Sequence, residues 1–180
     1  VEFYGVTATK RRISKRYRVP ALDSRLIAER TRAEARLIAA ARRAGVPTPI
    51  IRDITADSIL MERIEGMLLK DDLTEGHLLE AGRVVGRLHD GGIMHGDLTT
   101  SNMILRDGRC VLIDFGLAQV TTEIEQRGVD IHVLFQTLAS TTSESGALKA
   151  AFVQGYRETF AGADDVVARE HEIELRGRYL

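Results

Sequence analysis

Hydrophobic and polar positions divide the chain into a strand-rich first third and a helical remainder. In the first third, short apolar runs are bounded by Gly5 and by an Ala56-Asp57 turn, as the strands of a small sheet are. The expected strands cover residues 1–4, 6–13, 50–53 and 58–63. The pattern therefore predicts one small sheet in this part of the chain.

One long helix is predicted between the two pairs of strands. Residues 15–22 are typical of a loop, and Asp23 or Ser24 can then cap a helix that runs to about Ala44. A glycine and two prolines follow and stop the helix. The first third thus combines a sheet with a single helix.

The rest of the chain is mainly helical and contains one short hairpin. Apolar side chains recur at helical spacing over residues 78–89, 130–138 and 147–160. Residues 103–105 and 110–113 are expected to form strands around an Asp107-Gly108 turn. We therefore predict an α+β fold of two lobes. Residues 1–65 form a sheet lobe with one long helix, and residues 66–180 form a mainly helical lobe.

The long helix carries a carboxylate on its apolar face. At about 100° per residue, Glu34 falls within roughly 60° of the apolar stripe, whereas Glu29 is turned about 140° away from it. A buried carboxylate needs a cation. We expect Lys10, which lies within the preceding strand, to supply it. The alternatives are Lys15, Arg11, Arg12 and a local arginine such as Arg30.

Residues 94–118 contain the polar motif that carries the chemistry. The motif places His95-Gly96-Asp97 five residues before Asn102, and a short hairpin then leads to Asp114-Phe115-Gly116. Phosphoryl transfer requires oxygen ligands for Mg²⁺ and a carboxylate that orients the attacking hydroxyl or water. We assign Asn102 and Asp114 to the metal and Asp97 to catalysis. This spacing is much more specific than an isolated DFG triplet, and it indicates a kinase-type ATP site.

Two further assignments follow from the positions of residues around this motif. The backbone of residues 61–66, which link the lobes, is expected to meet the adenine edge, so Met61, Glu62 and Ile64 join the nucleotide site. Asp130 lies at the expected start of a helix. It is either an N-cap or, as in kinases, a brace for the catalytic loop.

Composition adds limits on location. The chain is 44% hydrophobic and 28% charged, and it has no apolar run of the roughly 18 residues that a membrane span needs. Its single cysteine, Cys110, falls in an apolar strand, which favours a buried structural thiol. We expect a cytoplasmic protein. Basic residues crowd into residues 10–18 and recur in the closing RGRYL, either as a solvated surface or as a contact for phosphate backbones.

These stretches resemble the small atypical kinase subunit of the KEOPS complex, the PRPK family, which is related to the RIO kinases. The resemblance covers essentially the whole chain. Its stretches are KRRISKRYR, ERTRAEARLIAAARRAGVPTP, LMERIEG, HGDLTTSN, IDFGLA and IELRGRYL. It implies a compact two-lobed kinase fold of an archaeal type, with ATP and Mg²⁺ as cofactors. It also implies an ATPase with weak Ser/Thr autophosphorylation, working beside the tRNA threonylcarbamoyltransferase that makes threonylcarbamoyladenosine.

Carried over by position, the resemblance assigns Lys10 as the ATP lysine and Glu34 as its helix partner. Asp97 becomes the catalytic aspartate, and Asn102 and Asp114 become the metal ligands. The partners implied are the transferase, the other KEOPS subunits and tRNA. We expect tRNA to contact the basic segment of residues 10–18 and the C-terminal tail.

Three departures from the family pattern carry expectations of their own. The chain begins without methionine and without the family's glycine-bearing loop, so it is expected to be part of a transferase-kinase fusion and, as given, to bind ATP weakly. Gly96 replaces the arginine of ordinary protein kinases, which removes the partner of a phosphorylated activation loop. The short segment between Gly116 and Asp130 leaves no platform for a peptide. We therefore do not expect regulation by loop phosphorylation.

Two alternative functions compete with this interpretation. Aminoglycoside and choline phosphotransferases also use HGDxxxxN and a following aspartate, but they need more helices after the metal aspartate than the 66 residues after Asp114 provide. A non-catalytic docking subunit is the other alternative. The intact set of Asp97, Asn102 and Asp114 argues against it.

Overall fold

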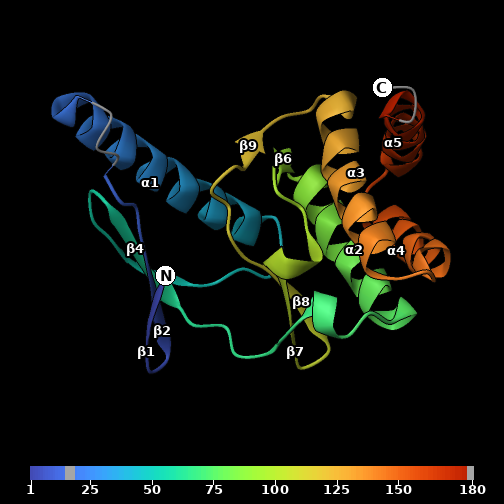
Figure 1. Ribbon diagram of the computed structural model, residues 1–180, viewed down its shortest axis with the longest axis horizontal. Coiled ribbons are helices and arrows are strands. Elements are labelled where there is room, and N and C mark those ends of the chain that lie inside the picture. Colours follow the sequence, from blue (N-terminus) through green and yellow to red (C-terminus); the bar gives the residue numbers. More distant parts are fainter. Residues whose placement is uncertain (15–18, 178–180) are drawn as a thin grey trace.

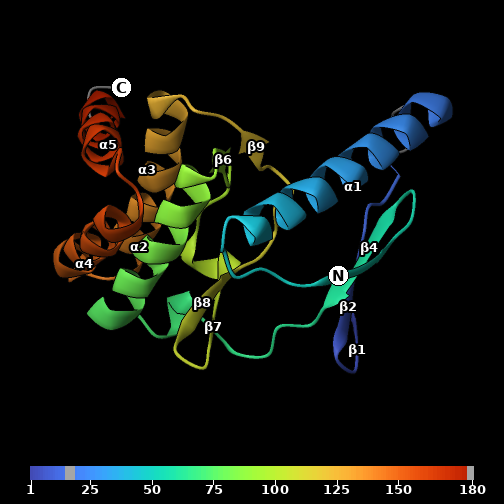
Figure 2. The same cartoon turned by 180° about the vertical axis from the view of Figure 1, so that it is seen from behind.

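The computed structural model describes residues 1–14 and 19–177. Its two lobes lie side by side, with the sheet and the long helix in one and the helical bundle in the other (Figures 1 and 2). This is the predicted two-lobed α+β architecture. The boundary predicted between residues 65 and 66 falls in the segment between strands β4 (Ser58–Glu62) and β5 (Met67–Leu68).

The first lobe contains a four-stranded antiparallel sheet in the order β1-β2-β4-β3. Its strands are β1 (Glu2–Tyr4), β2 (Thr7–Arg11), β3 (Ile51–Ile54) and β4 (Ser58–Glu62). Gly5 turns the chain between β1 and β2 with a φ of 53°, which a residue with a Cβ adopts only at a cost. In the register of β2 and β4, Lys10 lies opposite Ile59. The four strands lie where the apolar runs predict them.

The long helix α1 (Pro20–Arg43) begins earlier than the sequence pattern predicts. Val19 is its N-cap residue and Pro20 occupies its first turn, where proline's fixed φ suits a helix and its missing N–H is not needed. The expected cap at Asp23 or Ser24 is therefore wrong. Asp23 is buried within the first turn, and its carboxylate accepts a hydrogen bond from Ser14 Oγ at 2.7 Å.

A small sheet joins the lobes. Strands β7 (Met103–Arg106) and β8 (Arg109–Leu112) form the predicted hairpin, and β5 (Met67–Leu68) pairs with β7. Asp107 and Gly108 both have positive φ, at 51° and 73°, as a two-residue hairpin turn requires. Beyond the hairpin, β9 (Gln119–Val120) pairs with β6 (Ile93–Met94). Burial raises the pKa of the Cys110 thiol, in β8, to about 12, as befits a structural cysteine.

The second lobe is a bundle of four helices. These are α2 (Glu75–Asp90), α3 (Ile124–Thr141), α4 (Ser145–Thr159) and α5 (Ala163–Gly177); two short 3-10 turns cover Leu69–Asp71 and Thr100–Asn102. Helices α2 and α4 approach so closely that a Cβ at Gly82 would lie 2.1 Å from the Phe152 carbonyl oxygen. Within the described residues, no helix has the length and apolar content to cross a membrane.

Candidate active site

Lys10 and Glu34 meet between the sheet and helix α1. Glu34 is only 3% exposed, and its Oε1 lies 2.6 Å from Lys10 Nζ, so the predicted contact is present. Its second oxygen, Oε2, lies 2.5 Å from Nη2 of Arg12, two residues further along the chain. Arg11 instead faces Asp57 at 3.7 Å, and Arg30 is exposed. The buried carboxylate thus has two cationic partners, whereas the sequence predicts one.

Asp114 approaches the same lysine from the other lobe. Its Oδ1 lies 2.6 Å from Lys10 Nζ and accepts a hydrogen bond from the Gly116 backbone N–H at 3.1 Å. Burial opposes ionisation of Asp114, but the hydrogen bond and charge of Lys10 outweigh it and hold its pKa below the ordinary value. Asp114 has a φ of 60°, a conformation that costs energy for a residue with a Cβ. Such strain is typical of functional sites.

Asn102 holds Asp97 in place. Its Nδ2 donates hydrogen bonds to the Asp97 carbonyl oxygen at 2.8 Å and to Asp97 Oδ2 at 2.9 Å. The Asn102 carbonyl oxygen in turn accepts from the Ile113 backbone N–H at 3.0 Å, which extends the hairpin ladder by one step. The hairpin therefore brings Asn102 beside Asp114, as its predicted turn requires.

Asp130 braces the loop that carries Asp97. Helix α3 begins at Ile124 rather than near residue 130, so Asp130 lies inside the helix and the N-cap alternative is wrong. Asp130 is 1% exposed, and its two oxygens accept hydrogen bonds from the backbone N–H groups of His95 at 2.6 Å and Gly96 at 2.8 Å. His89 Nε2 lies 3.3 Å from Asp130 Oδ2. The catalytic-loop brace was the other alternative, and the geometry matches it.

Gly96 is required by the path of this loop. Its φ is 79°, and a Cβ there would lie 2.3 Å from the Leu117 carbonyl oxygen. An arginine, as in ordinary protein kinases, does not fit in this conformation. The His95 side chain packs beside Phe115, with ring centroids 5.1 Å apart, and its Nε2 lies 2.9 Å from the Ile113 carbonyl oxygen.

A cavity of about 210 Å³ unites the predicted nucleotide residues. Its lining includes Lys10, Glu34, Met61, Glu62, Ile64, Asn102 and Asp114. Asp97 is not in this lining, but it accepts a hydrogen bond from Asn102, which is. The Glu62 side chain binds Arg106 Nη1 at 2.7 Å, so it fastens the segment between the lobes to β7.

The cavity also has apolar walls that the sequence analysis missed. They include Ala8, Ile38, Ile104 and Ile113. Ala8 could have been found, because residues two apart in a strand share a face and Ala8 precedes Lys10 by two. Ile104 and Ile113 belong to the predicted hairpin, but a buried hairpin residue and one facing a ligand have the same sequence pattern.

Parts of two predicted contact segments lie outside the described residues. Residues 15–18 complete the basic segment of residues 10–18, and residues 178–180 complete the RGRYL tail. Lys15, the main alternative partner for Glu34, is among them. The tRNA contacts expected there stay predictions.

Comparison with known families identifies the chain. The sequence profile of the RIO domain matches residues 4–129. A probable serine/threonine-protein kinase BUD32 homologue of Archaeoglobus fulgidus is 46% identical over 171 residues, which cover 95% of this chain and 87% of that protein. The chain belongs to the RIO-domain family, in its BUD32-like branch. The resemblance to this kinase family, drawn from the sequence motifs, is thereby confirmed.

Longer relatives contain a BUD32-like domain as one part. Proteins named as probable bifunctional tRNA threonylcarbamoyladenosine biosynthesis proteins are 70% identical in Methanoculleus marisnigri and 63% identical in Methanospirillum hungatei, each over 180 residues. Each match covers 100% of this chain but 34% and 35% of those proteins. The chain thus spans about a third of the length of these curated relatives.

Solved structures show the same fold at low identity. An aminoglycoside phosphotransferase from Streptomyces rimosus matches with a TM-score of 0.62 at 16% identity, covering 92% of this chain and 87% of that one. The Rio2 kinase of Chaetomium thermophilum matches with a TM-score of 0.57 at 17% identity, covering 90% and 59%. Because small-molecule kinases and RIO kinases share the BUD32-like fold, the fold alone does not choose the phosphate acceptor.

Proposed function

We propose that this BUD32-like chain is the ATP-hydrolysing kinase component of a KEOPS-type assembly that makes threonylcarbamoyladenosine in tRNA. The observation that carries the ATP chemistry is the convergence of Lys10, Glu34 and Asp114, whose charged groups meet at distances of 2.6 Å beside one cavity. The role in tRNA modification is supported by the names and lengths of the bifunctional relatives. In this proposal the neighbouring transferase is the domain's immediate partner.

The side chains divide the chemistry among them. Lys10 binds the nucleotide phosphates, and Glu34 holds the lysine in position. Met61, Glu62 and Ile64 place the segment between the lobes along the adenine, and the apolar walls exclude water from it. Asp97 accepts the proton of the attacking water or hydroxyl and orients it in line with the γ-phosphoryl group. Asn102 fixes the Asp97 carboxylate through its 2.9 Å hydrogen bond.

The donor set fits Mg²⁺. Asp114 presents a half-exposed carboxylate whose pKa is held low by Lys10 against the opposing effect of burial, and Asn102 donates through its nitrogen, which leaves its amide oxygen available. Mg²⁺ in kinase sites takes one or two protein oxygens and completes its shell with phosphates and water. When bound, the ion neutralises charge that develops on the phosphates. Among the described residues no group of three acidic, histidine or cysteine side chains forms a protein-only metal site.

The two alternative functions receive less support. An aminoglycoside phosphotransferase shares the fold at only 16% identity, whereas the RIO-domain profile matches residues 4–129 of this chain and a BUD32 homologue is 46% identical to it. A docking subunit without catalysis has no need for the strained Asp114 or for a catalytic loop braced by Asp130.

The decisive experiment measures Mg²⁺-dependent ATP hydrolysis by the intact protein that contains this chain, with and without tRNA. We expect tRNA to stimulate turnover, and Asp97→Ala to lower it by about 10²-fold or more, the usual contribution of a positioned general base. Asp165→Ala removes an exposed carboxylate from α5 and serves as the charge-matched control. Turnover that responds neither to tRNA nor to Asp97→Ala would contradict the proposal.

A further inference from the structure

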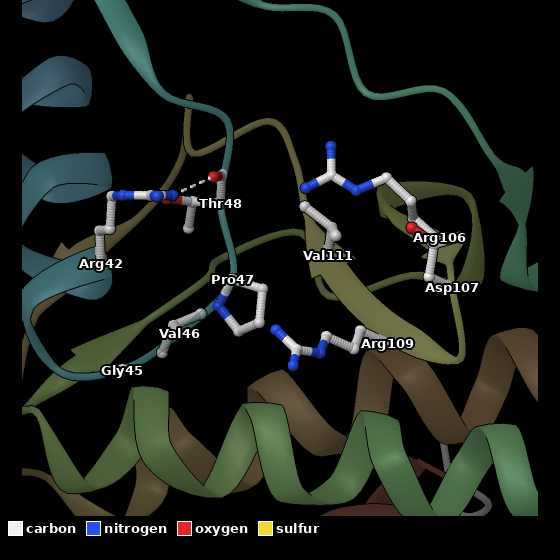
Figure 3. Close-up of a pocket in the computed structure, with 9 residues that line it drawn as sticks. All are labelled: Arg42, Gly45, Val46, Pro47, Thr48, Arg106, Asp107, Arg109 and Val111. Atoms are coloured by element: carbon white, nitrogen blue, oxygen red, sulfur yellow. Dashed lines mark hydrogen bonds between the residues drawn. The ribbon is translucent and has the colours of Figure 1, made fainter.

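A second cavity, of about 610 Å³, lies where the end of α1 meets the β7–β8 hairpin (Figure 3). None of its lining residues belongs to the lining of the nucleotide cavity. The lining consists of Arg42, Gly45, Val46, Pro47, Thr48, Arg106, Asp107, Arg109 and Val111. The cavity is therefore a separate feature of the fold, and the proposed ATP chemistry makes no use of it.

Positive charge dominates its walls. Arg42 lies in the last turn of helix α1, and Arg106 and Arg109 flank the hairpin turn, so three guanidinium groups surround an opening whose lining holds one carboxylate, Asp107. In Figure 3, Arg42 and Arg109 lie on opposite sides of Pro47. Arg106 binds Glu62 at 2.7 Å, but no acidic side chain of the described residues forms an ion pair with Arg42 or Arg109.

The charges of these arginines also act on Glu62, whose carboxylate is paired with Arg106. Burial raises the pKa of Glu62, yet the hydrogen bond from Arg106, the Ile50 N–H and the charges of Arg106 and Arg42 together hold it below its ordinary value. The charges of Arg106 and Arg42 thus act together on this carboxylate.

One buried polar side-chain atom in the wall of this cavity has no partner among the described residues. Thr48 lines the cavity and is 3% exposed, and its Oγ1 forms no hydrogen bond within the described part of the chain. Buried polar atoms almost always have a partner in folded proteins. Thr48 Oγ1 is an exception to this rule in the cavity wall.

Phosphate is the ligand class that this arrangement favours. A guanidinium group can donate two parallel hydrogen bonds to two oxygens of one phosphate, which the ammonium group of lysine does not do. The lining contains no aromatic residue on which a base could stack, which favours a backbone phosphate over a nucleobase. Structured RNA presents such phosphates at fixed spacing along its helices.

We propose that Arg42, Arg106 and Arg109 form a phosphate-binding pocket that holds the backbone of a structured RNA. The choice of RNA as the source of the phosphates rests on the proposed function, whereas the pocket itself does not. It would add a tRNA contact on the hairpin side of the protein, apart from the basic segment of residues 10–18 and the C-terminal tail.

The test uses Arg42→Gln/Arg109→Gln in the intact protein, because Arg106 also anchors Glu62. Binding of a labelled tRNA transcript is measured by fluorescence anisotropy over a range of salt concentrations. We expect affinity to fall by about tenfold or more, since each charge-assisted contact contributes at least a factor of that order. The slope of log K against log salt should fall by roughly 0.7 to 0.9 for each phosphate that the variant no longer neutralises.

Arg25→Gln/Arg157→Gln is the matched control, because it removes the same charge from two exposed side chains that do not line the cavity. We expect it to leave the salt slope unchanged. Arg42 donates a hydrogen bond to the Thr48 carbonyl oxygen at 2.8 Å, so thermal unfolding of each variant is recorded. If the double variant does not fold, Arg109→Gln alone retains the test.

Calorimetric titrations with tripolyphosphate and with poly-glutamate distinguish the possible ligands. Loss of tripolyphosphate binding together with weaker tRNA binding supports the proposal. Unchanged tRNA affinity overturns the RNA assignment, and if only poly-glutamate binding is abolished, the pocket serves an acidic protein segment instead.

ATP turnover without tRNA is measured in the same samples. Normal basal turnover with weakened tRNA binding shows that the pocket variant leaves the proposed ATP chemistry intact, whereas absence of basal turnover in the parent protein counts against the proposed function alone.

Discussion

Lys10 and Glu34 lie 24 positions apart in the sequence, yet Lys10 Nζ and Glu34 Oε1 are 2.6 Å apart. The contact joins strand β2 to helix α1, and because Asp114 Oδ1 is equally close to the same ammonium, it also joins the two lobes. The orientation of the long helix is therefore coupled to the geometry of the catalytic side of the cavity. A substitution in either element should therefore alter nucleotide binding.

Arg12 should matter for this coupling more than its exposed neighbour. Arg12 is paired with the second oxygen of Glu34. In Arg12→Gln, Lys10 is the only cation left beside this buried carboxylate, and Lys10 must also bind the nucleotide phosphates. We expect a loss of about 1 to 2 kcal/mol in the free energy of unfolding, together with a higher KM for ATP. Urea unfolding and steady-state kinetics measure the two effects.

Arg11→Gln is the matched control for Arg12, because Arg11 lies one position away, is 60% exposed and only faces Asp57 at 3.7 Å. Exposed pairs of this kind contribute little. Equal effects of the two substitutions on the KM for ATP would argue that Arg12 acts only through the general charge of the strand.

Gly96 offers a test of the backbone path in the catalytic loop. Gly96→Ala places a Cβ 2.3 Å from the Leu117 carbonyl oxygen and imposes a φ of 79° on an alanine, so we expect a loss of at least about 3 kcal/mol in stability and of most ATP turnover. Gly108→Ala is the control. Its φ of 73° is similar, but no atom lies within 4 Å of the new Cβ, so about 1 kcal/mol is expected. If both variants lose the same stability, the close approach to Leu117 is unimportant.

The catalytic loop also shows how far sequence reasoning reaches. The approach of Asn102 to Asp114 follows from a motif and a two-residue hairpin turn, which are local features of the chain. The hydrogen bonds from Asn102 to Asp97 were not predicted. The partner of Glu34 could be inferred from helical periodicity, because a carboxylate among apolar side chains requires a cation. These parts of the site were predictable because each rests on spacing within one or two elements.

Other features depend on ambiguous or distant signals. Proline both breaks helices and begins them, so residues 20–22, which were expected to belong to a loop, lie in the first turn of α1, started by Pro20. Asp130 is an acceptable cap by residue type, and only the packing of α3 against the catalytic loop reveals its two backbone partners. The second cavity brings together Arg42, Arg106 and Arg109, which no local sequence pattern connects. Their proximity requires the tertiary fold.

Asp130 should stabilise the catalytic loop more than an ordinary buried aspartate does. Asp130→Ala leaves the N–H groups of His95 and Gly96 without acceptors in a buried place, so we expect at least about 3 kcal/mol of destabilisation. Asp130→Asn keeps one acceptor oxygen and should lose less. Urea unfolding measures the loss of stability, and ATP turnover at a temperature where both variants are folded measures the effect on the loop, with exposed Asp90→Ala as the control. Full turnover by folded Asp130→Ala would show that the loop holds its geometry without the brace.

His89 should make stability depend on pH. His89 is fully buried, with Nδ1 2.7 Å from the Tyr156 hydroxyl and Nε2 3.3 Å from Asp130 Oδ2. Burial lowers its pKa in the folded protein, although the hydrogen bond and charge of Asp130 oppose that shift. Above the unfolded pKa of about 6.5, histidine is neutral in both states and adds no pH dependence. Below it, the unfolded chain binds a proton that the folded protein does not.

The free energy of unfolding should therefore decrease as the pH falls below about 6.5, by at most about 1.4 kcal/mol per pH unit for this one proton. Urea unfolding between about pH 7.5 and about pH 5.5 measures the slope. His89→Gln should be less stable at neutral pH, because it changes two buried contacts, but its stability should vary less with pH. His171→Gln, which replaces a side chain that is 67% exposed, should keep the wild-type slope. A wild-type slope in His89→Gln would assign the pH dependence to another histidine and leave His89 a purely structural contact of Asp130.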